Sequence, residues 1–377
     1  MKVGRLQIGR QSPADVALLA RNLEHWPEFL EITKEFRTVI LETRSAPIPI
    51  ASLWTVLSTM VRQSVSVGWA SFAASSRESN VKVLFGTDQT REPFDKLARL
   101  QPSIKQVLVA HASVRRDVLL LHNHIDRVEG RLLCVWGQHD AALYKEVFKD
   151  SVECVVVGSL RNAMHIKRHG LDSNRSPTLP LLFVSQFSGL DEDDPIRSPD
   201  RSRVLRTLKQ YLFRYCSERN LPLKIAMRPP VSGTPEPGHV EDEIQHYKQV
   251  FAGVTLSFTD PYVPYSTYVA SDAADVTIGV PSGSLTESFG RGNKVLMFGQ
   301  NPQSGDYLGF PLAGDWLICE PTYQEFEVKL DILRGENRIT KSRQWQDSRC
   351  YMIEDAETEE PVTRVVNLLQ EMLFVGF

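Results

Sequence analysis

Short runs of apolar residues, each followed by a turn or a helix-like stretch, recur along this chain and constrain its fold more than any other feature. The runs are continuous rather than alternating, as parallel strands covered on both faces require. The strands predicted from them are Thr38–Leu41, Val81–Phe85, Gln106–Ala110, Leu132–Trp136, Glu153–Val157, Leu181–Ser185, Leu223–Met227, Val254–Phe258, Val276–Val280 and Lys294–Phe298.

Helix-like segments separate many of these strands. The predicted helices are Pro13–Phe36, Ala51–Gln63, Pro93–Leu100, Arg201–Arg219, Ser284–Arg291 and the amphipathic segment Val362–Leu373. Strands that alternate with helices predict an α/β fold with doubly wound parallel sheets.

The length of 377 residues suggests two domains, each large enough for its own core. Residues Arg161–Pro180 are polar and broken by glycine and proline, which is typical of a linker. We therefore expect an N-terminal domain over residues 1–165 and a C-terminal domain over residues 175–377, with a last helix able to pack back on the N-terminal domain. Two such sheets facing one another leave a cleft between the carboxyl ends of their strands.

Charge and cysteine usage narrow the class of protein. The net charge of −3 argues against a dedicated nucleic-acid binder, because it provides no overall basic field. Five widely spaced cysteines, an odd number, fit a reducing cytoplasm. The sequence lacks a signal-peptide core and an apolar run long enough to span a bilayer, so a cytoplasmic protein is expected, with any membrane contact peripheral and at the inner face of the cytoplasmic membrane.

The segment from Ala274 to Phe298 is the sharpest chemical signal. A buried strand is expected to end at Val280, a tight turn to follow at Pro281–Gly283, and a helix to begin at Ser284. Ser284 and Glu287 have the spacing of a capping box, in which the side chain of each residue accepts a hydrogen bond from the backbone N–H of the other. The backbone N–H groups at such a helix start suit a phosphate or carboxylate. The simpler alternative is a well-capped helix without a ligand.

Two polar residues follow predicted strands of the N-terminal half. Asp88 comes after the strand Val81–Phe85 and could attack an anomeric carbon or deprotonate a hydroxyl, or it could only shape a turn. His111 ends the next strand and could orient Asp88 or bond a sugar, or it could be an ordinary surface residue. The cluster His122–Asp126 has no matching ligand pair elsewhere, so neither a metal nor another cofactor is expected.

The C-terminal segment, with its serines after the strand, its helix glutamate and its Gly292-Asn293-Lys294-Val295 ending, resembles the nucleotide-binding domain of bacterial GT-B transferases. Val81–Arg116 and Leu133–Ser159 are similar to the retaining β-Kdo transferases of lipopolysaccharide O-antigen and capsule synthesis. This resemblance implies a GT-B fold of two Rossmann-like domains facing a central cleft.

The resemblance also implies site residues. Ser282, Gly283 and Ser284 would contact the nucleotide phosphate, and Glu287 would support the site or the sugar. CMP-sugar transferases often have a His-Pro pair where this chain has Arg228-Pro229, and Arg228 could supply positive charge to a phosphate or a sugar carboxylate. In the N-terminal domain, Asp88 and His111 would be the catalytic pair.

The implied activity is transfer of a sugar, with Kdo from CMP-Kdo as the first choice, to an oligosaccharide or lipid-linked glycan acceptor. Other donors remain open: a CMP-nonulosonic acid, a UDP- or GDP-hexose, or CDP-glycerol. A non-catalytic nucleotide-sugar-binding subunit of a polysaccharide assembly complex is a further alternative. A nucleotide-sugar epimerase ranks lower, because its paired N-terminal acids are not found in the sequence.

Overall fold

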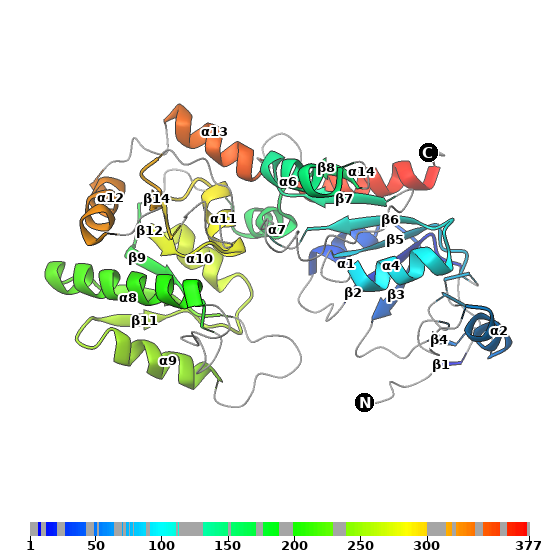
Figure 1. Cartoon of the computed structure of the whole chain (residues 1–377), viewed down its shortest axis with the longest axis horizontal. Helices are drawn as coiled ribbons and strands as arrows, with labels where there is room; N and C mark the ends of the chain where they lie inside the picture. The colour runs from blue at the N-terminus through cyan, green and yellow to red at the C-terminus, as the bar shows by residue number, and fades with distance from the viewer. Residues whose placement is uncertain are drawn as a thin grey trace.

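The computed structural model contains two six-stranded parallel sheets (Figure 1). The residues that it describes are 7–8, 13–20, 27–42, 49–50, 53–63, 70, 73–74, 76–77, 79–87, 91–110, 112, 131–149, 152–170, 176–187, 199–228, 239–299, 314–318, 322–335, 342–354 and 360–374.

The N-terminal sheet has the strand order β3-β2-β5-β6-β7-β8. Its strands are β2 (Val16–Ala20), β3 (Thr38–Glu42), β5 (Val83–Thr87), β6 (Lys105–Val109), β7 (Arg131–Val135) and β8 (Glu153–Val156). A separate two-residue pairing joins β1 (Gln7–Ile8) to β4 (Pro49–Ile50) near α2 (Leu53–Gln63).

Helices cover both faces of the N-terminal sheet. One face packs against α1 (Pro27–Thr33), α7 (Leu160–His169) and α14 (Pro361–Phe374). The other face packs against α4 (Arg91–Leu100) and α6 (Gln138–Phe148). The last helix of the described chain, α14, thus lies on the sheet formed by the first half of the sequence, on the face that also carries α1 and α7 (Figure 1).

The C-terminal sheet has the strand order β11-β10-β9-β12-β13-β14. Its strands are β9 (Leu179–Val184), β10 (Leu223–Ala226), β11 (Leu256–Phe258), β12 (Ala274–Gly279), β13 (Val295–Phe298) and β14 (Leu317–Ile318). Its helices are α8 (Pro199–Arg219), α9 (His239–Val250), α10 (Ser266–Ala273), α11 (Gly283–Gly290), α12 (Tyr323–Gly335) and α13 (Arg343–Met352).

All ten predicted strands are present, and their ends lie within two residues of the predicted ones. The core explains this agreement, because β5, β7 and β13 are buried along their whole length, as continuous apolar runs require. None of the helices that the structure describes is both long and apolar enough to cross a membrane.

The predicted helix Pro13–Phe36 is wrong. Its first part forms the strand β2, which pairs with β3 and β5, and only Pro27–Thr33 is helical within the described part of this segment. The β2 sequence Val-Ala-Leu-Leu-Ala is rich in helix formers, yet Val16 to Leu19 are fully buried inside the sheet. Burial on both faces of a sheet outweighs the weak helical propensity of alanine and leucine.

The expected linker Arg161–Pro180 is also wrong over its first half, because α7 occupies Leu160–His169. The Ser159 side chain caps this helix by accepting a hydrogen bond from the Asn162 N–H at 3.2 Å. Gly170 follows the helix at φ 73°, a left-handed conformation that glycine adopts readily. The polar residues in the first half of this segment therefore belong to a packed helix.

Candidate functional site

The strand order of the C-terminal sheet marks a topological switch point between β9 and β12. From β9 the chain proceeds outwards to β10 and β11 on one side, and it returns to β12 on the other. Open α/β sheets bind ligands outside the carboxyl ends of the strands at such a point. Here the residues at those ends are Ser185 to Phe187 after β9 and Val280 to Gly283 after β12.

The turn between β12 and α11 presents a capped helix start at this edge. Ser282 is the N-cap of α11, and its Oγ accepts a hydrogen bond from the Leu285 N–H at 3.3 Å. Residues 281–284 are half-buried, so the turn keeps contact with solvent. The first N–H groups of a helix lack partners within the helix and carry its positive dipole end, so Gly283 and Ser284 present backbone donors suited to an anion.

The predicted capping box is wrong. The helix begins at Gly283, one residue earlier than expected, and Ser282 takes the capping position assigned to Ser284. Glu287 does not reach back to the helix start. Its carboxylate instead accepts hydrogen bonds from Ser159 Oγ and Tyr268 Oη, each at 2.5 Å.

Glu287 joins three helices inside the protein. It is only 3% exposed, and its two hydroxyl partners come from the N-cap of α7 and from α10. Burial raises the pKa of Glu287, and the bonds from Ser159 and Tyr268 act in the opposite direction. In this arrangement both carboxylate oxygens are used within the protein, between the two sheets.

The β12–α11 turn lies against the carboxyl edge of the N-terminal sheet. A Cβ atom built on Gly283 would be 3.4 Å from Cη2 of Trp136 and 3.6 Å from Cβ of Ala112. Trp136 directly follows β7, and Ala112 lies shortly after β6. The carboxyl edges of the two sheets therefore meet at Gly283.

Arg228 lies two residues beyond β10, at the same edge of the C-terminal sheet. It is half-buried, and its Nη1 donates to the backbone oxygen of Phe187 at 3.3 Å. Within the described ranges no carboxylate forms an ion pair with it. A guanidinium that keeps its charge at a strand end can donate charge-assisted hydrogen bonds to a phosphate or carboxylate ligand.

The two residues predicted to be catalytic, Asp88 and His111, lie outside the described residues. The strands that precede them are in place: β5 ends at Thr87, and β6 ends at Val109. The cluster His122–Asp126 also lies outside the described residues. Among the residues that the structure does describe, no group of three or more histidine, cysteine, aspartate or glutamate side chains is arranged to hold a metal ion.

Sequence reasoning missed a polar network that connects α7 to the C-terminal domain. Asn162 Nδ2 donates to the backbone oxygen of Glu287 at 2.9 Å, and Arg291 Nη1 donates to Asn162 Oδ1 at 2.6 Å. Arg291 Nε donates to Asp272 at 2.7 Å, and the His165 ring bonds the other oxygen of Asp272 at 2.6 Å. The only sequence signal for this network is the polar character of the predicted linker Arg161–Pro180.

The network fixes the position of α7 between the domains. Its residues Leu160 and Met164 pack into the core of the N-terminal sheet, whereas Asn162 and His165 bond to the C-terminal domain. Figure 1 shows α7 between the two sheets, close to α10 and α11. The helix therefore serves as a shared element that holds the two carboxyl edges at a defined separation.

The His165–Asp272 contact makes this junction sensitive to acid. Burial lowers the pKa of His165 because it opposes the charged imidazolium, although the bond to Asp272 acts in the opposite direction. Burial alone would raise the pKa of Asp272, but the bonds from His165, Asn293 and Arg291 and the charge of Arg291 outweigh it and lower that pKa to about 2. Both shifts leave the folded state with fewer bound protons than the unfolded state.

We expect the protein to lose stability as the pH falls. The contribution of His165 is complete above its unfolded pKa near 6.5 and is lost below it, and that of Asp272 is lost between pH 3.8 and about 2. Melting temperatures of wild type and His165→Gln between pH 7.5 and 5 test this, with His239→Gln as the control. The variant should show a shallower dependence, and equal slopes would contradict the assignment.

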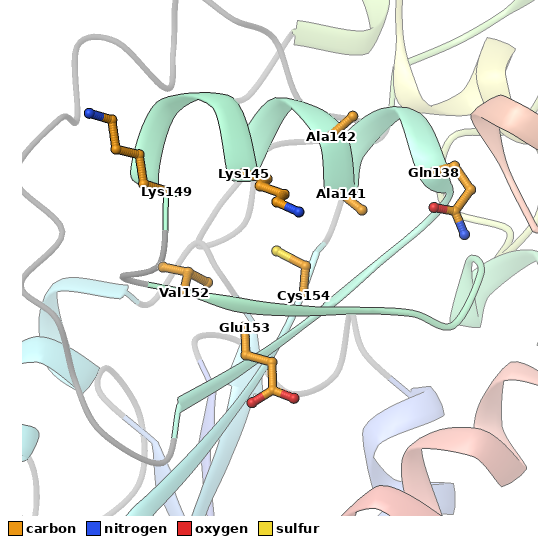
Figure 2. Close-up of a pocket in the computed structure, with 8 residues that line it drawn as sticks. All are labelled: Gln138, Ala141, Ala142, Lys145, Lys149, Val152, Glu153 and Cys154. Atoms are coloured by element: carbon orange, nitrogen blue, oxygen red, sulfur yellow. The ribbon is translucent and has the colours of Figure 1, made fainter.

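A separate cavity of about 510 Å³ lies on the N-terminal domain, between α6 and the edge strand β8. Figure 2 shows that Cys154 points from β8 toward the helix, whereas Glu153 points to the opposite side of the strand. Burial, together with the nearby negative charges of Asp140 and Glu153, raises the pKa of Cys154 to about 12, which disfavours the nucleophilic thiolate. Among the described residues, none from the C-terminal sheet lines this cavity, and neither does Arg228, Ser282, Gly283, Ser284 or Glu287.

Comparisons with known proteins find matches among solved structures. No family model matches the sequence, and no curated protein matches it. The UDP-GlcNAc 2-epimerase from Neisseria meningitidis bound to UDP-GlcNAc has a TM-score of 0.58 at 11% identity, covering 95% of this chain and 100% of that one. Sucrose-phosphate synthase from Thermosynechococcus elongatus also has a TM-score of 0.58, at 10% identity, covering 97% and 100%.

HepE from Anabaena, solved with UDP and glucose, has a TM-score of 0.56 at 10% identity, covering 95% of this chain and 99% of that one. Similarity at this level of identity shows the fold. The chain is an α/β protein of the GT-B type, with two Rossmann-like domains whose carboxyl edges face each other.

Proposed function

We propose that this chain is a glycosyltransferase that binds a nucleotide-activated sugar at the switch point of its C-terminal sheet. The observation that carries the proposal is the half-buried Pro281–Ser284 turn, which starts α11 at that point and meets the N-terminal sheet at Gly283. Arg228, at the end of β10, adds a cation that has no carboxylate partner within the described ranges. Together these groups suit the phosphate of a donor nucleotide.

For the donor we keep two candidates. The resemblance of the sequence to β-Kdo transferases favours CMP-Kdo. The structurally similar proteins solved with UDP-GlcNAc or with UDP and glucose favour a UDP-sugar. Either donor carries an anionic phosphate next to the anomeric carbon, so the same turn and arginine would stabilise the departing nucleotide. The proposed acceptor is an oligosaccharide or lipid-linked glycan, reached by peripheral contact with the cytoplasmic membrane.

For the chemical step we propose Asp88 as the carboxylate, with His111 orienting it or bonding the sugar. In a retaining reaction the Asp88 carboxylate would attack the anomeric carbon while the bond to the phosphate oxygen breaks. The acceptor hydroxyl would then attack the anomeric carbon, the bond to Asp88 would break, and the hydroxyl proton would pass to a phosphate oxygen of the departing nucleotide. The nucleotide leaves as an anion, held by Arg228 and the α11 turn. No metal is part of this proposal.

Nucleotide binding by the wild-type protein and by the variants Arg228→Ala and Asp88→Asn tests the proposal. For wild type, thermal shifts with CMP, UDP, GDP and CDP should single out one base, because only the cognate nucleotide stabilises the native state markedly. Arg228→Ala should weaken that binding about 10- to 100-fold through loss of charge-assisted hydrogen bonds. Asp88→Asn should bind the nucleotide as wild type does and lose transfer to the acceptor.

Arg62→Ala, which removes an exposed arginine of α2, is the matched control and should bind as wild type does. If none of the four nucleotides binds to the wild-type protein, the proposal is overturned. Wild type that binds the nucleotide but transfers no sugar, even with an acceptor glycan, would indicate a non-catalytic subunit. Full transfer by Asp88→Asn would remove Asp88 from its role.

A further inference from the structure

Glu243 is a fully buried carboxylate in the first half of α9, and sequence analysis did not single it out. A buried carboxylate costs free energy unless hydrogen bonds compensate for lost water. Its Oε1 accepts from Ser185 Oγ at 2.5 Å and from the Arg228 N–H at 3.4 Å. Both partners lie at the carboxyl edge of the C-terminal sheet, just after β9 and β10.

The contacts continue from these two partners. Ser185 Oγ shares a hydrogen bond with Tyr247 Oη at 2.8 Å and accepts one from the Phe187 N–H at 3.1 Å. The backbone oxygen of Phe187 in turn accepts from Nη1 of Arg228 at 3.3 Å. The bonds therefore form a closed ring through Glu243, Ser185, Phe187 and Arg228.

Through this ring the Glu243 carboxylate restrains both the backbone and the guanidinium of Arg228. It holds the backbone N–H of Arg228 directly, and it holds the guanidinium indirectly, through the turn that carries the Phe187 oxygen. A side chain whose position is fixed before the ligand arrives loses less conformational entropy on binding, and supporting residues of this kind raise affinity without contacting the ligand.

We infer that Glu243 is a positioning residue, which aims Arg228 at the anionic phosphate of the bound nucleotide. The inference rests on the proposed function, because it assigns Arg228 to that phosphate. Glu243 itself is fully buried, with its Oε1 committed to Ser185 and the Arg228 backbone, and it acts only through Arg228. The proposed site therefore includes Glu243, which does not contact the ligand but fixes the position of Arg228, which does.

A double-mutant cycle between Glu243 and Arg228 tests this. Dissociation constants for CMP and for UDP are measured by calorimetry on wild type, Glu243→Ala, Arg228→Ala and the double variant. Glu243→Ala should weaken binding of the cognate nucleotide about five- to tenfold. In the Arg228→Ala background the same change should have an effect of less than about twofold, because coupled residues are not additive.

Two further variants keep the test decisive if Glu243→Ala does not fold. Glu243→Gln keeps an oxygen that can accept from both Ser185 and Arg228, so it should bind within about twofold of wild type. Ser185→Ala removes the link to Phe187 and should weaken binding as Glu243→Ala does, again only when Arg228 is present. Glu241→Gln, exposed on the same turn of α9, is the control.

The outcomes separate the two proposals. If Arg228→Ala weakens binding and the Glu243 effect remains the same in its background, the positioning role is overturned while the nucleotide site stands. If Arg228→Ala binds as tightly as wild type, the proposed site itself is overturned, and the role of Glu243 with it. A uniformly lower melting temperature without coupling would indicate a purely structural residue.

Discussion

Glu287→Ala should lower the free energy of unfolding by about 3–5 kcal/mol, the usual cost of removing one partner from a buried ionic network. The change deletes the acceptor of Ser159 Oγ and Tyr268 Oη, and Tyr268 is itself buried. It also removes a negative charge that interacts with Arg161 and Arg291. These groups would be left in a site that water reaches poorly, so the loss exceeds that of two ordinary hydrogen bonds.

Urea unfolding measures this loss. The transition is monitored both by tryptophan fluorescence and by the susceptibility of α7 to proteolysis, because two domains need not unfold together. Glu287→Gln should cost less, since its amide can still bond both hydroxyls. Glu371→Ala, which removes an exposed carboxylate of α14, is the matched control. A loss below about 1 kcal/mol for Glu287→Ala would mean that the network does not hold the domains together.

Strand positions could be predicted from the sequence because each predicted strand is a continuous apolar run, and such runs have few alternatives in an α/β protein. Val16–Ala20 shows where this reasoning fails. Its alanine and leucine residues favour a helix locally, and only its place between β3 and β5 decides for a strand. That place is set by pairing with residues far along the chain, which no local pattern reports.

The sequence did not predict the helix α7 for a related reason. Its residues Asn162 and His165 are polar, and polar residues between two strands suggest an exposed linker. In the fold their partners are Glu287, Arg291 and Asp272, which lie more than 100 residues away in the sequence. A polar segment whose partners come from another domain cannot be distinguished from a solvated one without the tertiary structure.

In the candidate site, too, features set by local sequence could be predicted and features set by distant partners could not. The turn at Ser282 and Gly283 was predicted because a strand, a tight turn and a helix follow one another there within a few residues. The role of Glu287 was not predicted, because its partner Ser159 is 128 residues away in the sequence. Glu243 carried no signal either, since it follows two other acidic residues and only its burial sets it apart.

Trp345→Ala should also lower the free energy of unfolding by about 3–5 kcal/mol, the range for truncation of a fully buried large aromatic residue. Trp345 is fully buried, and its ring centroid lies 4.6 Å from that of Phe289 and 5.0 Å from that of Trp316. Phe289 belongs to α11 and Trp345 to α13, so the substitution removes an aromatic contact between these helices.

Trp345→Phe gives the contrast that identifies packing as the cause. Among the described residues the Nε1 of Trp345 has no hydrogen-bond partner, so phenylalanine gives up no bond there, and because it leaves a smaller cavity it should cost clearly less than alanine. Arg343→Ala, at a side chain that is 91% exposed on the same helix, should leave stability nearly unchanged. Because α13 also contacts α6, and Ile353 beyond it packs against Trp136, loss of Trp345 should loosen the junction on this side as well. Equal losses for the alanine and phenylalanine variants would show that shape-filling by an aromatic ring is not what α13 contributes.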